Sequence, residues 1–151
     1  MAETAYAQAS DLSAVLDSAL VTELQSSSGD VTAALNDASR ELDSYLGSRY
    51  AIPINTTASP KCAPILRQRT VAVAKYLFLS RKINVPPLAV EIAHAEYSAA
   101  LAWSRDVAKK LADLEDAAPK PIEDPALTVG RTPLLFGGEP PVFAGDDFLT
   151  F

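Results

Sequence analysis

Residues 31–54 constrain the fold more than any other stretch of the chain. Apolar side chains, closed by one arginine, recur there at intervals of three or four, which places them on one face of a 3.6-residue helix: Val31, Leu35, Ala38, Leu42, Tyr45 and Arg49. Asp30 precedes the run and can cap it, because its carboxylate can accept from free first-turn N–H groups. Gly47 weakens the far end and Pro53 forbids continuation. The pattern predicts an amphipathic helix, with residues such as Asp43 facing water, that ends in an ordered turn.

Three more helices are expected around this one. The first starts at Ser10 or Asp11 and closes at Leu24, before a Ser-rich loop. Another runs from Ile65 to about Lys82, and the last runs from Pro87 to about residue 116. Strand signals are poor before residue 127. The fold class expected is therefore all-α: a bundle of about four helices over residues 1–117, with a long C-terminal helix.

The last helix carries two apolar stripes. One consists of Ile92, Ala95, Ala99 and Ala102, and the other of Ala100, Trp103, Val107, Leu111 and Leu114. Either both stripes face one intramolecular core, or the alanine stripe meets a neighbouring subunit. The sequence does not separate these alternatives.

Residues 118–151 are expected to form an extended arm rather than an independent domain. They hold six of the eleven prolines and four of the six glycines, so a helix is excluded. They are also too apolar for a solvated tail. Arms of this kind bury their anchors on a partner or wrap their own domain. The candidate docking anchors are Leu134, Leu135, Phe136, Val142, Phe143, Phe148, Leu149 and Phe151.

Charge is unevenly distributed along the chain. The net charge of −6 argues against a protein whose main task is to grip nucleic acid. Residues 51–90 nevertheless contain no acidic residue. This segment is either a solvated helix face or a docking face for an acidic partner, and a nucleic-acid-binding module using residues 61–82 is the alternative function. The candidate docking cations are Arg67, Arg69, Lys75, Arg81 and Lys82.

Catalytic and metal-binding patterns are missing from the sequence. The single cysteine, Cys62, and the single histidine, His94, show no spacing that brings them together. Glu91 and His94 have the E-x-x-H spacing of di-iron bundles, but those sites need a second such pair. We therefore expect no enzyme, no cofactor and no metal. A signal peptide and a membrane span are not expected either, so synthesis in a cytosol is the expectation.

An ordered set of residues resembles the Mu-like tailed-phage head–tail joining proteins. Its most specific part is A-x-x-E-[LI]-D-x-Y-L-x-x-R-Y-x-[IL]-P, which matches residues 38–53 apart from the spacing of its last residues. Weaker matches lie on both sides: Tyr6, Asp11-Leu12, Pro64, Leu66, residues 73–77, Tyr97, Ala100-Leu101 and Trp103. The Ser-rich loop at residues 25–28 and the long arm depart from the family pattern.

The resemblance implies a structural subunit in the neck of the virion. Such adaptors form a ring, twelve-fold in the expected case, beneath the portal protein and join it to the next neck or tail-terminator protein. Genomic DNA passes through the channel without specific binding, and no membrane is involved. Within the motif, Tyr50 is expected to be buried, and Arg49 to be a structural partner of carbonyls or a carboxylate rather than a ligand site.

Overall fold

The computed structural model describes residues 5–121 except residues 27 and 83, within one compact unit, Met1–Pro121. This part contains five helices: α1 (Ala9–Ser13), α2 (Ser18–Ser26), α3 (Ser28–Leu46), α4 (Ala63–Ser80) and α5 (Pro87–Ala108). The described residues include no named strand, and one isolated bridge pairs Tyr50 with Pro119. The all-α prediction is confirmed, and α5 is the longest helix described.

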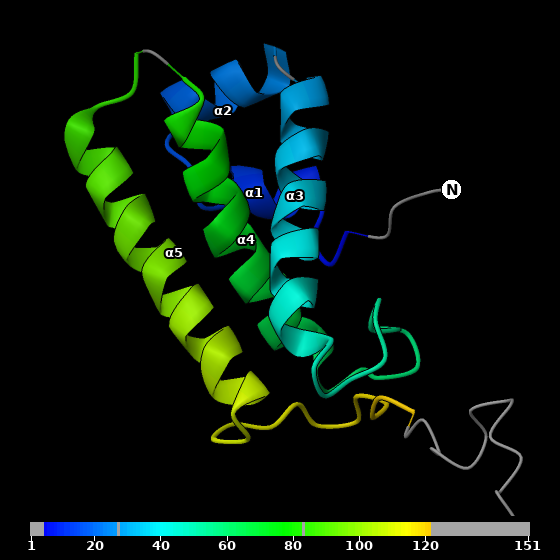
Figure 1. Ribbon diagram of the computed structural model, residues 1–151. Helices are drawn as coiled ribbons and strands as arrows, with labels where there is room; N and C mark the ends of the chain where they lie inside the picture. The colour runs from blue at the N-terminus through cyan, green and yellow to red at the C-terminus, as the bar shows by residue number, and fades with distance from the viewer. Residues whose placement is uncertain (1–4, 27, 83, 122–151) are drawn as a thin grey trace, which may run out of the picture. The chain divides into compact units, whose positions relative to one another are not determined.

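Helices α3, α4 and α5 lie side by side with α4 in the middle (Figure 1). The predicted apolar face of α3 is buried at Val31, Leu35, Ala38 and Leu42, whereas Tyr45 is only half-buried. Helix α4 buries Leu66, Val73 and Phe78 between its neighbours. The short helices α1 and α2 pack against α3, and α1 also packs against α4. The core therefore forms between α4 and the two long helices that flank it, α3 and α5.

Two helix starts differ from the prediction. The single helix expected over residues 10–24 is divided by a turn at residues 14–17, which buries Leu12 and leaves Val15 49% exposed. Helix α3 begins at Ser28, so Asp30 lies in its first turn rather than capping it. There the Asp30 carboxylate accepts a hydrogen bond from Lys82 Nζ at 3.0 Å. A carboxylate in the first turn still complements the helix dipole.

Helix α5 ends at Ala108, eight residues before the predicted end near 116. The amide N–H of Leu111 donates to Asp106 O at 2.8 Å and that of Lys110 donates to Val107 O at 3.1 Å, which is a Schellman stop. Lys110 has φ 65°, in the left-handed region that normally favours glycine. Leu111, predicted to face the core, is 74% exposed as a result.

The two apolar stripes of α5 do not share one environment. Ala100 and Val107 are buried and Trp103 is half-buried, as the second stripe predicts. The first stripe is exposed throughout, with Ile92 49% exposed. The alternative in which both stripes face the intramolecular core is therefore wrong.

Candidate interaction surface

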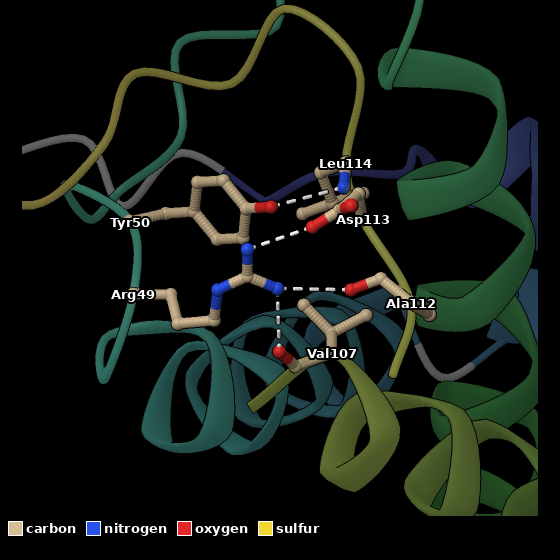
Figure 2. A network of polar contacts seen from close by, with 6 residues as sticks. All are labelled: Arg49, Tyr50, Val107, Ala112, Asp113 and Leu114. Atoms are coloured by element: carbon tan, nitrogen blue, oxygen red, sulfur yellow. Dashed lines mark hydrogen bonds and ion pairs between the residues drawn. The ribbon is translucent and has the colours of Figure 1, made fainter. Parts of the chain in front are cut away.

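Arg49 binds the end of α5 through its side chain (Figure 2). Its Nη1 donates to the carbonyl oxygens of Val107 and Ala112, both at 2.9 Å, and its Nη2 donates to the Asp113 carboxylate at 2.7 Å. The carbonyls of a last helical turn lack intrahelical partners and carry the negative end of the helix dipole. A cation that donates to Val107 O therefore caps α5 and holds the segment that follows it.

Tyr50 binds the same segment at the next residue, Leu114. Its hydroxyl accepts a hydrogen bond from the Leu114 amide at 3.0 Å, and its side chain is 7% exposed. The Ala51 amide donates to Ala118 O at 3.0 Å, so the backbone after the motif also pairs with the returning chain. The expectations for Arg49 and Tyr50, a structural partner and a buried ring, are confirmed. We call residues 43–54 together with residues 107–120 the base clamp.

Tyr6 connects the N-terminal segment to the base clamp. Its hydroxyl donates to the Asp43 carboxylate and accepts from the Ile54 amide at 2.9 Å, while its own amide donates to Ser39 Oγ at 3.2 Å. Burial, reinforced by Asp43, raises the pKa of Tyr6 well above its ordinary range, and burial also raises the pKa of Asp43. Asp43, predicted to face water, is only partly exposed and is bonded to Tyr6. Sequence reasoning missed this pair because its members lie 37 positions apart.

The five predicted docking cations of α4 and its C-terminal end all line hollows on one side of the domain. Four of them pair with carboxylates of other helices: Arg67 with Asp11 (3.8 Å), Lys75 with Glu96 (3.0 Å), Arg81 with Asp37 (2.7 Å) and Lys82 with Asp30 (3.0 Å). Such pairs each contribute at most about 1 kcal/mol when exposed. Their effect here is to neutralise the basic segment locally.

Arg69 is the exception among these cations. Its guanidinium lies over the Trp103 ring, 5.4 Å from the centroid, and forms no ion pair among residues 5–121. Its Nε is buried and has no hydrogen-bond partner in that part of the chain. A buried polar nitrogen without a partner is costly and calls for an explanation.

An apolar strip runs along the outer face of α5, beside these hollows. It consists of the predicted alanine stripe, Ile92, Ala95, Ala99 and Ala102, with Leu88 one turn before it. Leu88 is 65% exposed, and the small side chains further along leave the helix backbone closely approachable. Exposed apolar surface that is continuous along a helix is typical of an interaction site.

The sites considered for chemistry stay apart. Cys62 is buried and donates to Ser59 O at 3.2 Å, and burial raises the pKa of its thiol. Glu91 and His94 are exposed, and the His94 ring packs edge-on against Tyr76. No group of three potential metal ligands occurs among the described residues. A helix long and apolar enough to cross a membrane is also missing from that part of the chain.

The predicted anchors of the arm lie outside the described residues: Leu134, Leu135, Phe136, Val142, Phe143, Phe148, Leu149 and Phe151. Their docking role, like that of the basic residues, stays a prediction.

Comparison with known protein families gives a match. The family described as "Bacteriophage Mu, Gp36" matches residues 6–128, a span that includes every described helix and the base clamp. No curated protein and no solved structure matches the chain. Because the match covers well over half of the sequence, the chain belongs to the bacteriophage Mu Gp36 family and is a phage protein.

Proposed function

We propose that this protein is a structural head–tail connector that forms a ring beneath the portal of a tailed-phage head. The observation that carries the proposal is the alanine stripe, which leaves an apolar helix face uncovered on a domain whose core is already complete. Family membership supplies the phage context. A ring needs a surface that meets a different surface of the next copy, and a straight, small-residue helix face suits that contact.

The partners follow from the same proposal. One side of the ring meets the portal protein and the other meets the next neck or tail-terminator protein, while the arm docks on the portal or on a neighbouring subunit. A net charge of −6 suits a channel wall past which DNA moves, because like charge removes the attraction behind non-specific binding. The role is structural, and the virion neck is its location.

The alternative of a nucleic-acid-binding module finds less support. Four of the five cations it requires are paired with carboxylates, so phosphates would have to displace Asp11, Glu96, Asp37 and Asp30. We therefore expect no shift of duplex DNA on a gel at physiological salt.

The direct test is immunogold electron microscopy of virions with antibody raised against this chain. We expect label at the joint between head and tail. Co-expression with the portal protein of the same phage should also give a complex whose mass, by mass photometry, fits a ring of this chain on the portal. Label confined to the capsid shell or tail tip, with no portal complex, would contradict the proposal.

A further inference from the structure

Three hollows join into one groove between the α1–α2 side of the domain and α5, with α4 as its floor. The first has a volume of about 550 Å³ and includes Val15, Val71 and Ala99 in its lining. The next, of about 180 Å³, shares Val15 and continues past Ile92. The third, of about 560 Å³, shares Leu20 with the second. The groove is therefore long enough for an extended peptide rather than a compact small molecule.

The first hollow combines apolar walls with one unmatched positive charge. Arg67 and Glu96, which also line it, pair with Asp11 and Lys75. Among the described residues, Arg69 is left without a carboxylate and its Nε lacks an acceptor. The occupant that satisfies this hollow has a carboxylate next to large apolar side chains.

We infer that this groove takes residues 146–151 of a second copy of the chain. That segment reads Asp-Asp-Phe-Leu-Thr-Phe, so carboxylates at Asp146 and Asp147 directly precede the anchors Phe148, Leu149 and Phe151. One carboxylate answers Arg69, and the aromatic and aliphatic side chains fill the apolar hollows. Extended peptides bind through side chains set in pockets, and acidic motifs bind through arginines.

That residues 146–151 come from a second copy, rather than from the same chain, rests on the proposed ring. Ile92 and Ala99 belong to the alanine stripe and also line the groove, so a neighbour packed on the stripe stands at the edge of the groove. The 24 residues from 122 to 145 span up to about 80 Å when extended, whereas α5, with 22 residues, is about 33 Å long. The segment can therefore reach an adjacent subunit.

Disulfide trapping between full-length copies tests the inference. A Val15→Cys copy is mixed with a mass-tagged Thr150→Cys copy, oxidised under native conditions and run on a non-reducing gel. We expect a heterodimer at least tenfold more abundant than with a Ser44→Cys copy, the matched control on the exposed side of α3. Adding Arg69→Glu to the groove copy should reduce trapping by about the same factor, and Asp147→Lys in the other copy should restore it.

Each outcome decides the question. Trapping no better than the Ser44→Cys control overturns the inference, and so does trapping that Arg69→Glu leaves unchanged while circular dichroism shows the variant folded. In a chain carrying both Val15→Cys and Thr150→Cys, a disulfide confined to the monomer would assign the segment to its own groove and overturn the second-copy occupant. Rings seen by mass photometry without the disulfide would leave the proposed function intact and remove only this inference.

Discussion

The base clamp and the groove beside α5 contain similar residues, but these residues differ in how fully they are bonded. In the base clamp, the Arg49 guanidinium has three acceptors within 2.9 Å, and Tyr50 is buried with its hydroxyl bonded. On the outer side, the Arg69 guanidinium has an aromatic ring beneath it and a buried nitrogen without an acceptor in the described residues. The alanine stripe beside it is exposed. The polar groups of the base clamp have their partners within the described chain, whereas the Arg69 Nε and the alanine stripe lack partners there.

The difference teaches where a motif acts in this molecule. Asp43, Arg49 and Tyr50 are polar positions of the family motif, and each of them holds a segment that is distant in sequence. The motif therefore specifies the fold of one subunit. Contacts between subunits are expected at residues outside the motif, along α5 and the groove.

Removal of the Arg49 side chain should have the largest effect on stability. Arg49→Ala deletes three charge-assisted hydrogen bonds, including those that the carbonyl oxygens of Val107 and Ala112 accept. We expect the free energy of unfolding to fall by about 3 kcal/mol in urea titration. The control is Arg67→Ala, whose exposed 3.8 Å pair should contribute less than about 1 kcal/mol. Equal losses in the two variants would remove the distinction between clamp and surface.

Tyr6→Phe should have the next largest effect. It keeps the ring but removes the hydroxyl that bridges Asp43 and the Ile54 amide, so both groups lose a buried partner. A loss of about 2 kcal/mol is expected in the same titration. Tyr97→Phe is the matched comparison, because the Tyr97 hydroxyl makes one bond, to Glu41 at the partly exposed α3–α5 contact. If Tyr97→Phe costs more than Tyr6→Phe, the Tyr6 tie is not the stronger one.

Tyr97, on the inward face of α5, should make the free energy of unfolding depend on pH, with a smaller effect than Tyr6→Phe. The hydrogen bond to Glu41, followed by burial, raises the pKa of Tyr97 from 10.0 to about 12. The folded state thus keeps a proton that the unfolded state loses, so stability should decline between about pH 10 and pH 12. Tyrosinate absorbance in the near ultraviolet should show a group that titrates near pH 12, before Tyr6 does, and that Tyr97→Phe removes. A titration unchanged by the substitution would refute the assignment.

The smallest effect on folding should come from the alanine stripe. Ala95→Glu places a charge on exposed helix surface and should change the free energy of unfolding by no more than about 0.5 kcal/mol. Self-association, measured by analytical ultracentrifugation, should nevertheless be lost. Ala33→Glu, at an exposed position of α3, is the control that should still assemble. Assembly of both variants alike would show that the stripe is not an interface.

The sequence predicts those features that depend on local pattern. Helical periodicity identifies α3, α4 and most of α5, together with the buried faces of α3 and α4. It does not give the end of α5, because that stop depends on a left-handed Lys110 and on Arg49, which lies 58 positions away from Val107. Neither glycine nor proline marks the site.

The candidate surface is predictable only in part. Composition identifies the basic segment, but the carboxylates that neutralise four of its cations come from three other helices and cannot be inferred from spacing. Periodicity likewise finds two stripes on α5 without saying which one is buried. Only the packing of α5 against α3 and α4 decides that.

A cryo-electron microscopy map of the assembled oligomer, at a resolution that shows side chains, tests the central claim most directly. We predict a neighbouring subunit in van der Waals contact with Ala95 and Ala99, while Arg49 keeps its bonds to Val107, Ala112 and Asp113 of its own chain. A map in which the alanine stripe faces solvent and Arg49 binds the neighbouring subunit would contradict this account.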